Sequence, residues 1–314
     1  MVEILLYRSE HKEIWNGFIL NAKNAHFMFC REYMEYHSDR FEDHSLMFMV
    51  ENKLVAVLPS NVDKNILYSH QGLSFGGIIT NNKMTAALML NIFSKLIEYL
   101  KANGFKKLIY KAMPYVYSTL PAQEDLYALN IKGAKLYRVD ASSTIEFSNK
   151  IDLSSRRKRG VRKALKNNFS VVKSSDYATF HSLLSDVLAR VHNITATHSL
   201  SEIQFLAKKF PQNISLNATL DNNDEMHAAI LMFEMNHWVH AQYITSSDKG
   251  KSYGALDLLF SKLINTIYTK KKFFDFGIST ESQGQVLNTG LITQKEEFGA
   301  RTIVHNFFEL VISS

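Results

Sequence analysis

The sequence predicts the same series of secondary-structure elements twice along this 314-residue chain. Apolar runs alternate with short polar turns in residues 45–72 and again in residues 213–244, which predicts a three-stranded antiparallel meander in each segment. A glycine-bearing stretch follows each meander, and then a helix with apolar residues every three to four positions. The sequence FSKLI stands in both helices, at residues 93–97 and 260–264, and another strand follows each helix. The chain is therefore expected to fold as two copies of one unit.

The length agrees with two domains, because a chain of this size can bury two separate cores. A basic helix is expected from Ser154 to Lys166, and it belongs to neither meander. We therefore expect a boundary between Ser148 and Asp152, which gives domains 1–150 and 151–314. Each domain is expected to have a mixed α+β (α/β) fold, with a central, mainly antiparallel sheet flanked by helices.

Several functional classes are disfavoured by composition. No run approaches the roughly 20 apolar residues that cross a bilayer, and residues 1–10 do not resemble a signal peptide, so a cytoplasmic protein without membrane contact is expected. The single cysteine, Cys30, cannot form an internal disulfide, and the scattered histidines predict no metal site. Much of the net charge of +6 lies in residues 156–166, which favours a local anion site over a nucleic-acid surface.

A strand that ends at Thr245 leads through a polar, glycine-bearing segment into a helix. Such a segment suits a diphosphate, because the N–H groups at a helix N-terminus attract anions. An ordinary strand-to-helix turn that uses glycine for positive φ explains the same pattern.

The second half resembles the GNAT acyltransferase fold, and the whole chain resembles the FemAB-like double-GNAT transferases. Residues 251–256 (KSYGAL) are the nearest match to the GNAT loop that binds the pyrophosphate of acyl-CoA, although the first and last positions depart from its pattern. Four longer segments, residues 29–48, 68–77, 240–260 and 273–299, are similar to bacterial double-GNAT proteins encoded with surface-polysaccharide genes.

This resemblance implies two tandem GNAT-like domains and an acyl-CoA co-substrate without a metal. It implies transfer of an acyl group, acetyl or 3-hydroxybutyryl, to the amine of a dTDP- or UDP-linked amino deoxysugar used for surface polysaccharide. The first domain would be the acceptor side with a degenerate donor site, and the second would bind acyl-CoA. The expected donor-binding residues are Ser247, Lys249, Lys251, Tyr253, Gly254 and Ala255.

Two alternatives stay open. One is a FemX-like transferase that takes an aminoacyl group from tRNA to a peptidoglycan precursor, and only this alternative involves a nucleic acid. The other is a non-catalytic protein that binds a sugar nucleotide. A monomer or weak dimer is expected in each case.

Three residues are candidates for catalysis. His240 suits a proton acceptor or a hydrogen-bonded core histidine, and the two-residue period of a strand predicts that it shares a face with Gln242, opposite Tyr243. Asp275, among aromatic residues, suits orientation of a histidine, binding of a hydroxyl, or capping of the turn at residues 277–279. Lys295 is similar to a lysine that FemX-like enzymes place beside the acceptor, which implies charge stabilisation. Its alternative is a solvated lysine paired with the adjacent glutamates.

Acceptor-binding residues are expected in both halves. In the basic helix, Arg159 suits either a nucleotide phosphate or plain solvent exposure. The other expected substrate contacts are His70, Gln71, Tyr117, His198, Gln242 and Tyr243.

Overall fold

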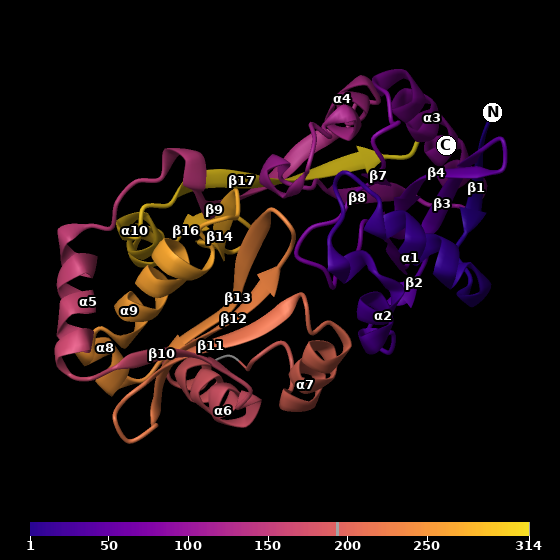
Figure 1. Ribbon diagram of the computed structural model, residues 1–314. Coiled ribbons are helices and arrows are strands. Elements are labelled where there is room, and N and C mark those ends of the chain that lie inside the picture. The colour runs from indigo at the N-terminus through magenta and orange to yellow at the C-terminus, as the bar shows by residue number, and fades with distance from the viewer. Residues whose placement is uncertain (193–194, 314) are drawn as a thin grey trace. The chain divides into compact units, whose positions relative to one another are not determined.

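The computed structural model describes residues 1–192 and 195–313 (Figure 1). Its contacts divide the chain into unit 1, which comprises Met1–Asp140, Ser282–Gly284 and Val304–Ser314, and unit 2, which comprises Ala141–Glu281 and Gln285–Ile303. The boundary expected from sequence assigned residues 304–314 to the second domain. They cluster with unit 1 because the last strand, β17 (Arg301–Val311), pairs through Phe307–Val311 with β8 (Lys107–Lys111).

Unit 1 contains the elements of the first copy. Its helices are α1 (Lys12–Leu20), α2 (Arg31–Met34), α3 (Ala86–Ala102) and α4 (Glu124–Ile131). Besides β8 and the end of β17, its strands are β1 (Val2–Leu6), β2 (Glu42–Asp43), β3 (Leu46–Val50), β4 (Lys53–Leu58), β5 (Asn61–Asp63), β6 (Ile66–Tyr68), β7 (Ile79–Thr80) and the start of β9 (Lys135–Glu146). Strands β1, β3, β4 and β7 form one antiparallel sheet, whereas β17, β8, β6, β5 and β2 lie in another.

The first predicted meander is wrong at its third strand. Strands β3 and β4 form the expected hairpin, with Glu51 and Asn52 at positive φ in the turn, but β4 then pairs with β7 rather than with the next apolar run, β6. Residues 61–63, in one of the expected polar turns, form β5. Pro59 directly follows β4 and has no N–H to continue the ladder. The chain accordingly leaves this sheet, and β5 forms a new hairpin with β6.

Unit 2 follows the sequence prediction closely. Its helices are α5 (Ser155–Lys166), α6 (Tyr177–Val187), α7 (Leu200–Lys209), α8 (Asp248–Tyr253), α9 (Ala255–Lys262) and α10 (Thr289–Glu297). Its strands are β10 (Ser170–Ser174), β11 (Ile214–Leu220), β12 (Met226–Glu234), β13 (Trp238–Ser246), β14 (Phe273–Ile278), β15 (Thr280–Glu281) and β16 (Val286–Leu287), together with the end of β9. The predicted meander is β11–β12–β13, with turns where they were expected.

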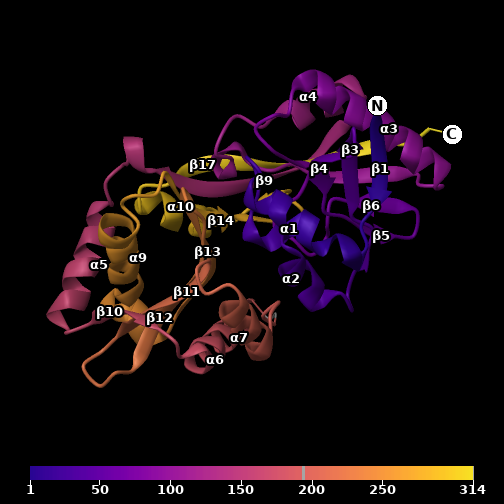
Figure 2. The ribbon, with the colours of Figure 1, turned by 45° about the vertical axis from the view of Figure 1, so that its right-hand side comes forward.

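The sheet of unit 2 carries helices on both faces (Figures 1 and 2). Alternate residues of β12, such as Ile230 and Met232, pack into a core with α5 and α9. Leu231 and Phe233 point to the opposite face, where residues of α7 pack. The mixed α+β class with mainly antiparallel sheets flanked by helices is confirmed. Among the described residues, no helix is both long and apolar enough to cross a membrane.

Helix α5 begins where the sequence predicted, because the Ser154 hydroxyl accepts a hydrogen bond from the Arg157 amide. It packs closely on the junction between α8 and α9, where Gly254 has φ +79°. A Cβ at Gly254 would lie 2.5 Å from the carbonyl oxygen of Gly160, so both backbones depend on the missing side chain. Helices α5 and α9 lie side by side in both views.

Candidate active site in unit 2

Two neighbouring strands of unit 2 separate after a short stretch of pairing. Strands β13 and β14 pair in parallel only where Trp238–His240 meets Phe273–Asp275. An extra residue, Gln242, interrupts the pairing of β13 with β12 directly afterwards, which is a β-bulge. Beyond this point Ile244 of β13 and Phe276 of β14 line a cavity of about 790 Å³ instead of pairing.

The cavity has basic and aromatic walls. Its lining includes Arg156 and Arg157 of α5, Thr245 and Ser246 of β13, Gly250 and Lys251 of α8, Leu256 and Phe260 of α9, and Gln294 and Lys295 of α10. The volume is typical of pockets for drug-sized ligands or cofactors.

The bulge corrects one prediction. His240 is opposite Phe233 on β12, and Tyr243 is opposite Leu231. Because Leu231 and Phe233 share a face, His240 and Tyr243 also share it, whereas the sequence period had put them on opposite faces. The extra residue shifts the alternation by one position.

His240 and Asp275 form a buried pair at the last paired position before the strands separate. The Nδ1–H of His240 donates to Asp275 Oδ2 at 2.5 Å, and the hydroxyls of Ser142 and Thr144 donate to Oδ1 at 2.9 and 3.0 Å. Asp275 is fully buried, whereas the His240 side chain keeps 11% exposure. These bonds hold the imidazole in the tautomer whose Nε2 can accept a proton. Asp275 thus orients a histidine, which was one of the interpretations predicted for it.

Gly277 of β14 lies beside this imidazole and has no side chain to cover it. Gly277 has φ +77°, and a Cβ there would lie 3.2 Å from His240 Cε1 and 4.0 Å from Nε2. Phe276, which lies between Asp275 and Gly277, lines the cavity. His240 and Asp275 themselves do not line it.

Lys295 is a buried cation, not a solvated one. Its residue exposure is 4%, and its Nζ donates to the carbonyl oxygens of Gly277 and Ile278 at 2.8 and 2.7 Å. Burial lowers the pKa of Lys295 to about 8, although the negative charge of Asp275 acts in the opposite direction. Glu297 pairs with Arg157 at 2.8 Å instead. The predicted alternative, a surface lysine paired with its neighbouring glutamates, is therefore wrong.

Only two of the six expected donor-binding residues line the cavity, Lys251 and Gly254. The segment expected as an open loop is helix α8, and the Ser247 hydroxyl caps it by accepting from the Gly250 amide at 2.9 Å. Tyr253 lies against Phe169, and Ala255 is fully buried in the core. The amides of Gly250 and Lys251 are used inside this turn, because they donate to the hydroxyl and to the carbonyl oxygen of Ser247.

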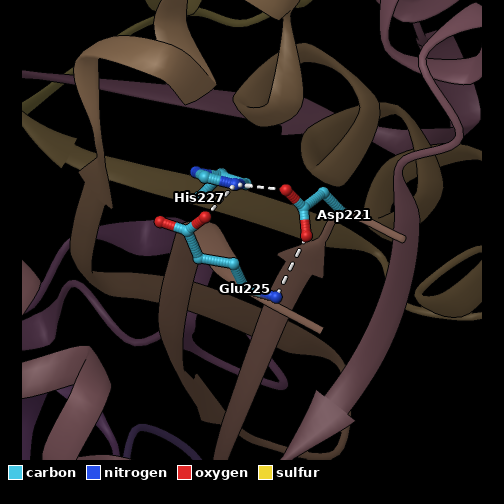
Figure 3. Close-up of side chains that lie close together, drawn as sticks. All are labelled: Asp221, Glu225 and His227. Carbon is cyan, nitrogen blue, oxygen red and sulfur yellow. Dashed lines mark hydrogen bonds and ion pairs between the residues drawn. The ribbon is translucent and has the colours of Figure 1, made fainter. Parts of the chain in front are cut away.

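Asp221, Glu225 and His227 form a polar cluster at the β11–β12 turn (Figure 3), and Lys249 is directed to it. Its Nζ lies 2.8 Å from Asp221 Oδ2, which also meets His227 Nε2 at 3.0 Å. His227 Nδ1 in turn contacts the hydroxyl of Ser247 at 3.1 Å. The carboxylate of Glu225 completes a group whose ligand atoms are close enough for a metal ion, and the ammonium of Lys249 contacts both carboxylates of this group. This cluster ties the hairpin to the N-terminus of α8.

The basic helix contributes a structural arginine that sequence reasoning missed. Arg157 Nη1 and Nη2 lie 2.8 Å from carboxylate oxygens of Asp257 and Glu297, so the side chain joins α5 to α9 and α10. Burial raises the pKa of Asp257 despite this partner. The predicted contact residue, Arg159, is exposed and does not line the cavity.

Replacement of Arg157 with alanine is expected to lower the free energy of unfolding by about 3 kcal/mol, because two largely buried carboxylates lose their counter-charge. Replacement of Arg159 is expected to change it by less than about 0.5 kcal/mol, as for most exposed positions. Urea denaturation of both variants compares them directly. Equal effects would show that Arg157 does not hold the three helices together.

The remaining candidates lie in separate places. His198 and Tyr243 form a hydrogen bond with each other on the α7 face of the unit 2 sheet, and Gln242 is the bulge residue. In unit 1, Gln71 hydrogen-bonds Asn61, and the buried Tyr117 packs its ring 4.5 Å from that of Phe75. His70 is buried and lines a second, smaller cavity in unit 1.

No family model and no curated protein matches this chain. Solved structures share its fold. The crystal structure titled FemX has a TM-score of 0.69 at 11% identity, and the match covers 98% of this chain and 97% of that one. L-PGS from Bacillus licheniformis has a TM-score of 0.59 at 10% identity over 83% and 82% of the two chains. A tandem GNAT protein from the clavulanic acid biosynthesis pathway has a TM-score of 0.53 at 8% identity over 100% and 99%. The chain therefore has a two-domain GNAT fold.

Proposed function

We propose that unit 2 transfers an acyl group to an amine, with His240 as the general base and Asp275 as the residue that orients it. One observation carries this proposal, the buried His240–Asp275 pair at the point where β13 and β14 separate. A base fixed by a carboxylate and set beside an opening between strands is suited to take a proton from a bound nucleophile.

The reaction needs no covalent enzyme intermediate. The neutral amine attacks the carbonyl carbon of the donor, a C–N bond forms, and His240 Nε2 takes the proton that the nitrogen loses. The ammonium of Lys295 donates two of its three hydrogens to the backbone carbonyls of Gly277 and Ile278. Its third hydrogen can stabilise the negative charge that develops on the carbonyl oxygen of the acyl donor. Collapse of the tetrahedral intermediate breaks the C–S bond of a thioester, and the thiolate leaves with the electron pair.

The donor that we favour is acyl-CoA, carrying an acetyl or 3-hydroxybutyryl group. The cavity is large enough for part of such a cofactor, and Arg156 and Lys251 supply positive charge for its phosphates. The acceptor that we favour is a dTDP- or UDP-linked amino deoxysugar for surface polysaccharide, acylated in the cytoplasm. This choice follows the sequence resemblance described above.

One observation favours a FemX-like aminoacyl-tRNA donor instead. The segment that should cradle the CoA pyrophosphate is the short helix α8, with its N-terminus capped by Ser247. The FemX crystal structure also matches nearly the whole chain. Under this alternative the same His240–Asp275 pair would serve aminoacyl transfer to a peptidoglycan precursor.

Calorimetric titration of the protein with acetyl-CoA distinguishes the two donors. If CoA phosphates contact Lys251, replacement of Lys251 with glutamate is expected to weaken binding about tenfold or more, because a charge-assisted contact becomes a repulsion. Lys262→Glu makes the same charge change at an exposed position at the end of α9 and should leave affinity unchanged. Absence of CoA binding, together with transfer from aminoacyl-tRNA, would favour the FemX-like alternative.

A further inference from the structure

The polar cluster at the β11–β12 turn, which the proposed reaction does not use, has the composition of a metal site. Asp221, Glu225 and His227 each offer one oxygen or nitrogen atom, and these three atoms lie within 4.8 Å of one another (Figure 3). Asp221 and His227 are 6% and 1% exposed, whereas Glu225 is open to solvent. The cluster therefore differs from an acidic surface turn, because it contains a buried imidazole and a buried carboxylate.

The spacing of the three atoms fits a tetrahedral zinc ion. Nε2 of His227 lies 3.0 Å from Oδ2 of Asp221 and 3.5 Å from Oε2 of Glu225. Bonds of ~2.0–2.1 Å to zinc place the ligand atoms of a tetrahedron roughly 3.3 Å apart, which is between these two distances. Imidazole and carboxylate groups are both ordinary zinc ligands, and a water molecule can complete the four-coordinate shell.

Both buried ligands are held in position by hydrogen bonds on their other atoms. Oδ1 of Asp221 accepts from the amides of Asn223 and Glu225 at 2.9 and 3.1 Å, which leaves Oδ2 directed at His227. Nδ1 of His227 lies 3.1 Å from the hydroxyl oxygen of Ser247. When Nε2 binds a metal, the imidazole hydrogen resides on Nδ1 and can be donated to this oxygen. Metal-binding histidines usually have such an acceptor for their other ring N–H.

A cation already lies at this cluster. The ammonium of Lys249 is 2.8 Å from Oδ2 of Asp221 and 3.5 Å from Oε2 of Glu225. The Lys249 side chain is 48% exposed, so it can move into solvent, and exposed ion pairs contribute little to stability. A zinc ion carries twice the charge of an ammonium and also bonds to the imidazole. Lys249 is thus a competitor that the metal can displace.

We propose that Asp221, Glu225 and His227 bind a zinc ion, which displaces the ammonium of Lys249. The site lies wholly within unit 2 and does not depend on the acyl-transfer proposal. Through Ser247, which contacts His227 and caps α8, the ion braces the β11–β12 hairpin against a helix that lines the larger cavity.

Calorimetric titration of the metal-free full chain with zinc chloride tests this site. Glu225→Gln removes one ligand from an exposed position, so the fold should persist. Asp224→Asn is its matched control, because it removes the same charge from the adjacent exposed residue, which is outside the cluster and has a positive φ that asparagine tolerates. Lys249→Gln removes the competing ammonium, and Lys262→Gln makes the same charge change at the end of α9.

The wild type is expected to bind one zinc ion per chain. Glu225→Gln should weaken binding about tenfold or more, and Lys249→Gln should strengthen it by up to about tenfold, with both controls unchanged. Cobalt(II) in place of zinc should give the visible absorption of a tetrahedral site in the wild type and lose it in Glu225→Gln.

Equal zinc affinity of the wild type and Glu225→Gln would contradict the site. Weaker binding by Lys249→Gln would also contradict it, because the lysine would then support the cluster instead of competing for it. Absence of zinc binding by both the wild type and Lys249→Gln would overturn the proposal. Equal binding of magnesium would reject the zinc assignment, since magnesium prefers oxygen ligands to an imidazole. Each of these results leaves the acyl-transfer proposal unaffected.

Discussion

Replacement of His240 with alanine is expected to lower turnover about 10²-fold or more, the usual effect of losing a general base. Donor affinity should change little, because His240 is not among the residues that line the cavity. Steady-state rates at saturating donor, together with calorimetric donor binding, measure both quantities. Turnover that persists while the protein becomes less stable would show that His240 is a structural histidine.

Asp275 provides a matched test of the same pair. Asp275→Asn keeps the shape of the side chain, but its amide can donate to His240 Nδ1 and so favours the tautomer with the hydrogen on Nε2. It should therefore lower turnover nearly as much as His240→Ala, and the double variant should be no worse than either. Lys262→Glu, at an exposed position at the end of α9, is a control that should retain turnover.

Lys295→Met is expected to lower turnover about 10²- to 10³-fold, the range found when one donor to a developing oxyanion is removed. The pH dependence gives a second signature. With its pKa lowered to about 8, Lys295 loses its charge as the pH rises above that value, so turnover should fall on the alkaline side. Lys295→Arg keeps a cation at all accessible pH values, and in this variant the alkaline fall should move upward.

Stopped or initial-rate assays from about pH 6 to 10 test this assignment. An alkaline fall that is identical in wild type and Lys295→Arg would mean that another group titrates. Normal turnover by Lys295→Met would show that the lysine only fastens the carbonyls of Gly277 and Ile278.

Local sequence patterns were sufficient to predict much of the secondary structure of unit 2. The turns of its meander, the strand at residues 273–278 and the cap at Ser154 follow from residues close together in the chain. The prediction of the first meander was wrong because the chain leaves the sheet at Pro59, although the apolar alternation continues past this residue. A pattern of period two shows which residues alternate but not which strand they pair with.

The candidate site depended more on contacts distant in sequence. His240, Asp275 and Lys295 were identified singly, but their relation depends on strand pairing and on the bulge at Gln242, which simple alternation cannot reveal. Ser142 and Thr144 gave no signal at all, because they reach Asp275 only through the pairing of β9 with β14.

We propose that His240, oriented by Asp275, catalyses acyl transfer to the amine of a nucleotide-linked sugar. Mass spectrometry of reactions with acetyl-CoA or 3-hydroxybutyryl-CoA and a panel of dTDP- and UDP-linked amino sugars tests it most directly. We expect one sugar to gain the acyl mass as an equal amount of CoA is released, and His240→Ala to abolish most of this product. Release of no CoA with any sugar, alongside wild-type activity with aminoacyl-tRNA and a peptidoglycan precursor, would contradict it.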